Sequence, residues 1–445
     1  MSTTYDRALE AIQERTATVG VIGLGYVGLP LCDALHAGGL AVLGFDTDPA
    51  KIEALRAGEP YIGHLGRELP ERLAASERFE PTSDFERLAE VDVILVCVPT
   101  PLAPDKEPDL RFVTDTGRAI GRALREGHLV VLESTTYPGT TRGAFLASVL
   151  EAHAGALESG EGFFVAYSPE REDPGSRTHA TRAIPKLVGG LDERATRLAA
   201  EVYRIGFDEV VEVSSAEVAE AAKLLENTFR AVNIALVNEL KVILDAMEVD
   251  VWEVVRAAAT KPFGFMPFFP GPGLGGHCIP IDPFYLAWKA REVDRPTRFI
   301  ELAGVINTEM PRYVLNRIAE GLARRSRTLR GASVLVVGLA YKRDVDDTRE
   351  SPSFVLIEEL RRAGAEVAYH DPLVPIAPRT RRYDLGMESV ELTPGRIAAS
   401  DAVLIATDHS CIDYAAIAAH ARLVVDTRDA MRGHEDALGD RLLRA

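Results

Sequence analysis

The sequence predicts an α/β protein in which two doubly wound domains are joined by a central helical region with a long helix. Three observations support this: short β-rich runs alternate with helical stretches in the first half, the same pieces return in the same order near the C-terminus, and a long run at helical spacing separates them. At 445 residues the chain is too long for one comfortable core. We expect Rossmann-like domains at residues 1–205 and 313–445, with a helical domain at 206–312.

The first domain opens with a glycine-rich turn between a strand and a helix. Residues 23–28, GLGYVG, match the pattern GxGxxG after a β-rich run that starts at Thr18. The first glycine permits the tight turn, the second lets the backbone approach a pyrophosphate, and the third allows close packing of the helix. The turn therefore predicts a dinucleotide site.

Asp46 ends the next strand about twenty residues further on, where a carboxylate can bond the ribose 2′-hydroxyl. The same carboxylate would repel a 2′-phosphate, so NAD is preferred over NADP. Lys51, five residues later, either undercuts that preference or faces solvent. Two more strands, in VDVILVCVPTP and HLVVLESTTYPGT, end in loops where such sheets bind ligands. The predicted cofactor contacts in this domain are Gly23, Gly25, Tyr26, Val27, Gly28, Asp46, Lys51, Thr100 and Thr135.

A long helix is predicted to begin near SSAEVAEAAKLLENTFRAVNIALVNEL, with Ser214 and Glu217 as a capping box. The alternative is two shorter helices that meet near Asn233. Apolar residues around most of its circumference predict that the helix pairs with its copy in a homodimer or higher homo-oligomer. Lys223 and Asn227 lie four residues apart on one face, either as a solvated stripe or as buried groups that need partners.

The loop PGPGLGGHCIPIDP, residues 270–283, places Cys278 between a run of glycines and Asp282. A nucleophilic thiol must become a thiolate, which requires positive charge or oriented N–H donors nearby. The glycines supply a backbone able to wrap around a substrate, and Asp282 could hold a water or orient Lys223. Hydride transfer alone needs no thiol, whereas oxidation of an aldehyde to an acid through a thioester does. The residues therefore indicate a dinucleotide oxidoreductase with a covalent cysteine.

The second copy of the α/β pieces lies in ASVLVVGLAYK, AEVAYHDPL, SDAVLIATDHS and ARLVVDTRDA. It retains only Gly338 where the first copy has three glycines. We expect a nucleotide-type fold that has lost the dinucleotide turn.

The composition limits the partners. A formal net charge of −17 argues against nucleic acid or an anionic membrane as a partner. The cysteines show no CxxC pairing, so no disulfide framework and no metal site is predicted. No signal-peptide pattern or membrane-length apolar run is present in the sequence, which favours a soluble, cytoplasmic protein.

Several motifs together resemble the UDP-glucose/GDP-mannose dehydrogenase family of nucleotide-sugar 6-dehydrogenases. They are GLGYVGLPL, STTYPGT, SPER, AAKLLENTFRAVNIALVNEL, PGPGLGGHCIPIDPFYLAWKA and YKRDVDDTRESP, in order from about residue 20 to 355. The resemblance implies a four-electron oxidation of a sugar C6 alcohol to the uronate, with reduction of two NAD. It also implies that the first domain binds NAD, the central one carries catalysis and dimerisation, and the last binds the nucleotide sugar.

Position by position, the resemblance assigns Cys278 as the nucleophile and Lys223 with Asn227 as the pair that stabilises the oxyanion at C6. It assigns proton handling to Asp282 with water and Thr135.

Glu170, in SPER, resembles the carboxylate that assists thioester hydrolysis, and Arg349 resembles a cofactor contact. Many family members carry an arginine ahead of the glycine loop, whereas this chain has Lys261 and an extra residue of spacing. Lysine cannot give the bidentate contact that arginine gives. The substrate contacts implied are Glu170, Lys223, Asn227, Lys261, Gly275 and Lys342.

The loop with Phe268, Phe269 and a histidine before the cysteine is similar to the branch that oxidises UDP-N-acetylglucosamine. The aromatic segment offers an apolar wall to an acetamido methyl, although a methyl contributes only ~1 to 3 kcal/mol. UDP-glucose or dTDP-glucose is the alternative substrate. Two other functions are considered. A single-oxidation hydroxyacid dehydrogenase leaves Cys278 and the second Rossmann-like domain unexplained, and an idle nucleotide-sugar sensor would need losses at Cys278, Lys223 or Asn227, none of which is lost.

Overall fold

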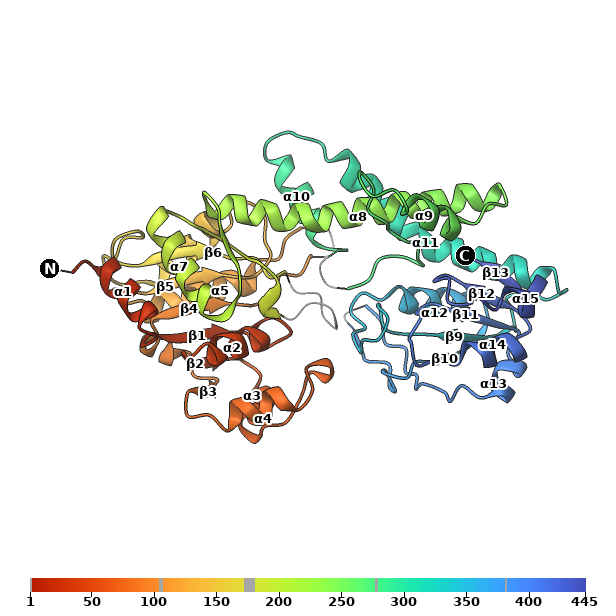
Figure 1. Ribbon diagram of the computed structural model, residues 1–445, viewed down its shortest axis with the longest axis horizontal. Helices are drawn as coiled ribbons and strands as arrows, with labels where there is room; N and C mark the ends of the chain where they lie inside the picture. Colours follow the sequence, from red (N-terminus) through yellow and green to blue (C-terminus); the bar gives the residue numbers. More distant parts are fainter. Residues whose placement is uncertain (1, 104–106, 172–180, 277–278, 381) are drawn as a thin grey trace. The chain divides into compact units, whose positions relative to one another are not determined.

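A computed structural model describes residues 2–103, 107–171, 181–276, 279–380 and 382–445 (Figure 1). Contacts divide the chain into two compact units. The first comprises Met1–Glu226 and Phe284–Arg295, and the second Asn227–Pro283 and Pro296–Ala445. Each unit contains a Rossmann-type sheet, as the sequence predicts.

The first unit is built on an eight-stranded sheet with the order β3-β2-β1-β4-β5-β6-β7-β8. Only the β6–β7 pair is antiparallel among its pairs. The central strands are continuous apolar runs, as expected for a sheet that is covered on both faces. The strands are β1 (Thr18–Ile22), β2 (Ala41–Phe45), β3 (Phe79–Thr82), β4 (Val93–Val96), β5 (Leu129–Leu132), β6 (Phe164–Tyr167), β7 (Lys186–Gly190) and β8 (Val210–Glu212).

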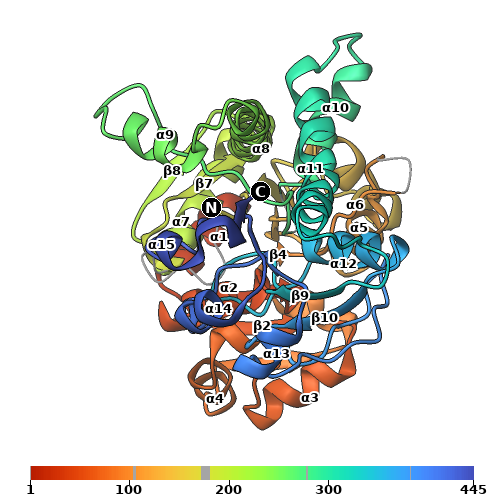
Figure 2. The same ribbon diagram turned by 90° about the vertical axis from the view of Figure 1, so that its right-hand side faces the viewer.

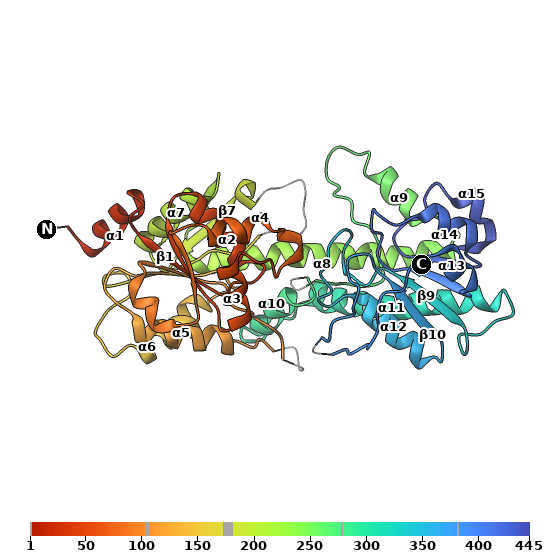
Figure 3. The same ribbon diagram turned by 90° about the horizontal axis from the view of Figure 1, so that it is seen from below.

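Helices cover both faces of this sheet and bury its two apolar cores (Figure 3). One face carries α1 (Thr4–Gln13), α2 (Gly28–Ala37) and α7 (Glu193–Gly206), and the other carries α5 (Arg111–Ala123) and α6 (Leu146–Ala152). The remaining helical elements of this unit are α3 (Pro49–Ala57), α4 (Glu68–Ala74), most of α10 (Asp282–Arg291), the 3-10 turns η1 (Gly63–Leu65), η2 (Phe85–Glu90) and η4 (Thr181–Ala183), and the π-helical turn η3 (Thr141–Phe145).

The predicted long helix is α8 (Ala216–Ala246), which is continuous through Asn233, so the alternative of two shorter helices is wrong. Its first turn is capped by Ser215, whose Oγ accepts a hydrogen bond from Val218 N at 3.3 Å. The cap thus lies one residue after the expected Ser214. The boundary between the two units falls within α8, after Glu226.

The second unit contains a five-stranded, all-parallel sheet with the order β10-β9-β11-β12-β13. Its strands are β9 (Ser333–Val337), β10 (Glu366–His370), β11 (Ala402–Ile405), β12 (Val424–Asp426) and β13 (Leu442–Arg444). One face is covered by α11 (Arg298–Ala323) and α12 (Pro352–Arg362), and the other by α13 (Pro394–Ala399), α14 (Tyr414–His420) and α15 (Glu435–Leu438) (Figure 2). The unit also contains α9 (Val251–Ala258) and η5 (Gly439–Arg441).

The predicted duplication is confirmed, because β2-β1-β4-β5 in the first sheet and β10-β9-β11-β12 in the second share one order. The first sheet continues past residue 205, the expected domain boundary, since β8 pairs with β7. The division into three domains remains a prediction. Within the described ranges, no helix combines the length and apolarity that crossing a bilayer requires.

Candidate active site

The glycine turn after β1 is shaped for a dinucleotide. Gly23 has a φ of 94°, and a Cβ there would lie 2.4 Å from the carbonyl oxygen of Cys97. At Gly28 a Cβ would lie 1.9 Å from the Gly23 oxygen. Gly25 differs, because no atom of the described residues lies within 4 Å of a Cβ built there, so a ligand can approach its backbone. Tyr26 and Val27 complete the turn before α2.

Asp46 follows β2, and its buried carboxylate faces this turn. Its Oδ2 accepts a hydrogen bond from Leu24 N at 2.9 Å, and its Oδ1 accepts one from Asp48 N at 3.0 Å. Lys51 Nζ lies 2.9 Å from Asp46 Oδ2. Lys51 is therefore an ion-pair partner of Asp46, the residue predicted to bind the ribose. Neither alternative from the sequence, a weaker preference for NAD or a side chain that faces solvent, included this ion pair.

Two other predicted cofactor contacts lie in loops after β4 and β5. Thr100 is buried, and its carbonyl accepts a hydrogen bond from the Tyr285 hydroxyl at 2.9 Å. Thr135 is half-buried just after β5. Both residues thus stand at the carboxyl ends of parallel strands, where ligands bind in this fold.

The turn that follows Thr135 is held by Glu220 of α8, a residue the sequence reasoning missed. Its carboxylate accepts hydrogen bonds from Gly139 N at 2.6 Å, Thr141 N at 2.9 Å and Thr141 Oγ1 at 2.7 Å. Burial raises the pKa of Glu220 to about 7, against these donors. An acid three residues before Lys223, on the face that also carries Asn227, was the available signal.

Lys223 and Glu170 are brought together in the first unit. Glu170 follows β6, and Lys223, buried on α8, donates a hydrogen bond from Nζ to the Glu170 carbonyl oxygen. The Glu170 carboxylate is approached by a second lysine, Lys186 of β7, with Nζ 3.8 Å from Oε2. Lys186 was not predicted, although a lysine at the head of the apolar strand KLVGG is an unusual placement.

Asn227 and Asp282 are brought together in the second unit. Asn227 Nδ2 donates a hydrogen bond to Asp282 Oδ2 at 2.6 Å, and Asp282 is only 2 % exposed. Lys223 and Asn227 on α8 are therefore buried groups with partners, and the alternative of a solvated stripe is wrong. The structure gives Asn227 as a partner of Asp282, whose expected partners were a water or Lys223.

Cys278, the predicted nucleophile, lies outside the described residues. The glycines before it pack against residues 341–352 of the second unit. A Cβ on Gly275 would lie 2.5 Å from Tyr341 Cβ, and Gly276 N donates to the Arg349 carbonyl at 2.8 Å. The loop therefore lies beside the segment that carries the two predicted ligand contacts of the C-terminal region.

Those two contacts are Lys342, which is half-buried, and Arg349, whose guanidinium forms a bidentate pair with Asp347. Lys261 is exposed, and its Nζ lies 4.9 Å from the centroid of the Phe263 ring. The substrate roles of Lys261 and Lys342 and the cofactor role of Arg349 remain predictions.

Arg428, two residues beyond β12, is a cation that the sequence reasoning missed. Its Nε donates to the Ala406 carbonyl at 2.9 Å, and a Cβ on Gly271 would lie 2.7 Å from its Nη1. Burial lowers the pKa of Arg428, while Asp408 and Asp426 act in the opposite direction. A guanidinium against the glycine loop is suited to an anionic ligand. Its position after a strand of the second copy was the only available signal.

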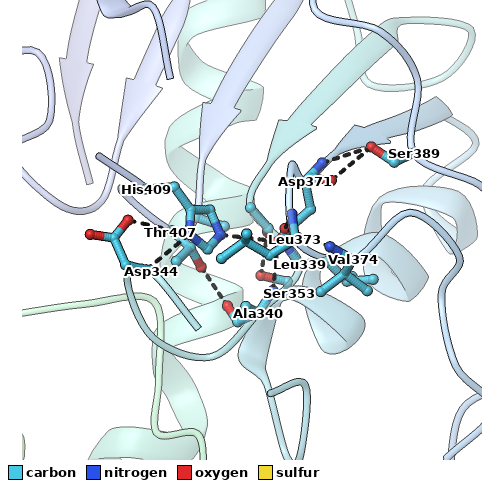
Figure 4. Close-up of polar contacts among 12 residues, drawn as sticks. Leu339, Ala340, Asp344, Ser353, Asp371, Leu373, Val374, Ser389, Thr407 and His409 are labelled. Atoms are coloured by element: carbon cyan, nitrogen blue, oxygen red, sulfur yellow. Dashed lines mark hydrogen bonds and ion pairs between the residues drawn. The ribbon is translucent and has the colours of Figure 1, made fainter. Parts of the chain in front are cut away.

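The corresponding turn of the second sheet is closed by its own side chains (Figure 4). Asp371, the counterpart of Asp46, accepts hydrogen bonds from Leu339 N at 2.6 Å and Ala340 N at 2.9 Å, and lies 3.1 Å from His409 Nε2. Gly338 keeps the conformation of its counterpart Gly23, with a φ of 94°, but Ala340 stands where the first turn has Gly25. This supports the prediction that the second copy has lost its dinucleotide turn.

The open glycine turn, its buried acid and the paired polar groups on α8 define an NAD-dependent oxidoreductase class, with a second nucleotide-type domain. Family models place the chain within that class. They match at residues 17–206 (NAD binding domain), 217–309 (central domain) and 335–433 (UDP binding domain). The chain belongs to the UDP-glucose/GDP-mannose dehydrogenase family, and its cofactor is NAD.

Relatives with different substrates resemble the chain over nearly its whole length. A UDP-N-acetyl-D-glucosamine 6-dehydrogenase of Pseudomonas aeruginosa is 37% identical over 398 residues, which cover 88% of this chain and 90% of the relative. The solved UDP-D-ManNAc dehydrogenase of Pyrococcus horikoshii has a TM-score of 0.86 at 31% identity and covers 96% of this chain and 98% of its own. A UDP-glucose dehydrogenase of Pyrobaculum islandicum has a TM-score of 0.83 at 31% identity, with coverage of 94% and 96%. The chain is thus an NAD-dependent nucleotide-sugar dehydrogenase.

Proposed function

We propose that the protein oxidises the C6 alcohol of UDP-N-acetylglucosamine to the uronate through a thiohemiacetal and a thioester on Cys278. The observation that carries this proposal is the burial of Lys223 and Asn227, one helical turn apart on α8, each with a polar partner. Their hydrogen bonds offset the cost of burying an ammonium and an amide and hold both groups in place, where they are suited to stabilise an oxyanion at C6.

The turn around Gly25, with Asp46, would hold NAD, which would supply a hydride acceptor for each of the two oxidations at C6. In the first, the hydroxyl proton passes through water to Asp282, and the aldehyde forms. The Cys278 thiolate then adds to the aldehyde carbon, and Lys223 and Asn227 stabilise the resulting alkoxide. After the second oxidation has produced the thioester, water assisted by Glu170 attacks the carbonyl carbon. The C–S bond breaks, the thiolate leaves, and the uronate is released.

The nucleotide end of the substrate is proposed to bind the second unit, within the matched UDP binding domain. Arg428 against Gly271, and Lys342 beside the glycine loop, are the cations proposed to meet the diphosphate. Local cations are needed because the chain as a whole carries a net charge of −17.

The acetamido sugar is supported by the aromatic residues of the loop before Cys278. Phe268 packs edge-to-face on Phe229 with ring centroids 5.6 Å apart, and Phe269 stacks on Trp252 at 5.8 Å. Phe269 remains 45% exposed, which leaves apolar surface for a methyl group. Relatives named for UDP-N-acetylglucosamine and UDP-N-acetylmannosamine support the same class of sugar. UDP-glucose and dTDP-glucose remain the alternatives.

Two measurements test the proposal. The ratio kcat/KM for UDP-N-acetylglucosamine, UDP-glucose and dTDP-glucose in one assay tests the sugar, and a clear preference for a glucose nucleotide would refute the acetamido assignment.

Counting NADH against uronate tests the thioester route, which requires two NADH per sugar. Cys278→Ser should stall after the first hydride or trap an ester, since an alkoxide leaves less readily than a thiolate. Cys411→Ser, which alters an exposed free thiol, is the control. One NADH per uronate in the wild type would exclude the route.

We also propose that the protein is a cytoplasmic homodimer that pairs through α8. Exposed apolar side chains recur on this helix at Leu225, Phe229, Leu236, Leu240 and Ile243. Their spacing forms one stripe, as expected for contact with a second copy. The free thiols of Cys32, Cys97 and Cys411 support a reducing compartment.

A further inference from the structure

We propose that Lys186, held by Glu133, is a positioning residue that fixes the Glu170 carboxylate for hydrolysis of the thioester. The inference rests on the proposed function, because it concerns the step assigned to Glu170.

The first support is a buried ion pair that neighbours the site. Lys186 Nζ lies 2.6 Å from Glu133 Oε2, and the two residues are 3% and 1% exposed. Burying two charges costs desolvation energy that their attraction repays only in part, so such a pair contributes little net stability. A role in organising neighbouring charge explains better why a charged pair links the end of β5 to the start of β7, on either side of β6, in an apolar sheet.

The second support is that the pair is held in one geometry. The Tyr203 hydroxyl donates a hydrogen bond to Glu133 Oε1, and Lys186 Nζ lies 5.1 Å from the centroid of the Tyr203 ring and 5.3 Å from that of Phe207. Burial acts to lower the pKa of Lys186, but the Glu133 and Glu170 carboxylates raise it overall. The ammonium therefore stays charged and has little freedom to move.

The third support is the way in which Glu170 is held. Its carbonyl accepts a hydrogen bond from Lys223, and its Oε2 lies 3.8 Å from Lys186 Nζ. One lysine thus fixes the backbone of Glu170 while the other attracts its carboxylate. A misplacement of about 1 Å at such a group can cost about 100-fold in rate. Lys186 acts through Glu170 and does not itself take part in the chemistry.

The test uses the full-length protein with NAD and UDP-N-acetylglucosamine, or UDP-glucose if the wild type prefers it. Lys186→Met alone would leave Glu133 buried without its cation and can prevent folding, so the main variant is the double substitution Glu133→Gln/Lys186→Met. Lys186→Arg tests rescue by a conserved charge, and Glu170→Gln is the reference. Lys241→Met is the matched control, because Lys241 is also a 3% exposed lysine, ion-paired with Asp245 at 3.3 Å.

In the double variant we expect kcat to fall about 10- to 100-fold with KM within about threefold. A pre-steady-state burst of NADH should remain, and intact-mass measurement should show the sugar-nucleotide acyl group accumulating on the protein, as in Glu170→Gln. Lys186→Arg should recover at least about a third of kcat. Lys241→Met should show neither accumulation nor a burst different from that of the wild type.

Two outcomes separate this inference from the proposed function. If Glu170→Gln accumulates the acyl enzyme and the folded double variant does not, Lys186 has only a structural role and the inference is wrong. If Glu170→Gln itself shows no acyl enzyme, the role assigned to Glu170 is wrong, and the inference is overturned with it.

Discussion

Among single residues, Asp46 gives a direct prediction about cofactor choice. Asp46→Ala should lower kcat/KM for NAD about tenfold, because the ribose loses its hydrogen-bond acceptor. It should also raise the use of NADP, because Lys51, 2.9 Å from Asp46 in the wild type, becomes free to pair with a 2′-phosphate. Steady-state kinetics with both cofactors checks this. Asp48→Ser, which retains a capping side chain for α3, should leave the preference unchanged. Equal use of both cofactors by the wild type would contradict the assignment.

Glu220 predicts a pH dependence of stability. A glutamate has a pKa near 4.5 when unperturbed, and burial raises that of Glu220 to about 7. Between these values the folded protein binds more protons at this group than the unfolded chain does, so the free energy of unfolding decreases as pH rises. The contribution is at most about 1.4 kcal/mol per pH unit. Urea unfolding between pH 5 and 7.5 should show a smaller slope in Glu220→Gln than in the wild type. Identical slopes would show that this carboxyl does not titrate there.

At the scale of the elements, the glycine turn predicts that one substitution lowers stability and another lowers affinity for NAD. Gly28→Ala should destabilise the protein by about 1–3 kcal/mol, because the added Cβ would lie 1.9 Å from a backbone oxygen. In Gly25→Ala the added Cβ meets no atom within 4 Å in the described part of the chain, so the thermal midpoint should stay near that of the wild type while KM for NAD rises. Thermal unfolding and NAD titration of both variants measure the contrast. A loss of stability in Gly25→Ala equal to that in Gly28→Ala would contradict it.

The same elements show what sequence patterns can and cannot predict. Repeated strand and turn patterns predicted β1, β2, β4, β5 and the four matching strands of the second sheet, because local spacing and terminal polar residues mark them. The antiparallel direction of β7 was not predicted, since its pairing with β6 is set by tertiary contacts and not by a local sequence pattern. The Lys186–Glu133 pair beside Glu170 was also not predicted, because its two residues lie 53 residues apart in the sequence. Side-chain type identified the candidate residues, whereas tertiary contacts decide which of them meet.

For the whole molecule, the exposed stripe of α8 predicts its assembly. Leu236→Glu/Leu240→Glu should shift the protein from dimer to monomer at micromolar concentration, because charges would be buried against apolar side chains. Sedimentation equilibrium checks this. Leu150→Glu, an exposed apolar position on α6, is the matched control and should leave the dimer intact. A wild-type monomer at micromolar concentration would contradict the proposal.

The closed turn of the second sheet has a kinetic consequence. Of the two duplicated glycine turns in the described part of the chain, the first keeps the open Gly25, whereas the second has Ala340 at that place, with its N–H donated to Asp371. The two oxidations of the proposed route must then draw on a single coenzyme pocket. In that route the reduced coenzyme has to depart and a fresh molecule has to enter while the sugar stays attached to the protein. The covalent bond to Cys278 would thus retain a half-oxidised intermediate during an exchange that could otherwise release it as a reactive aldehyde.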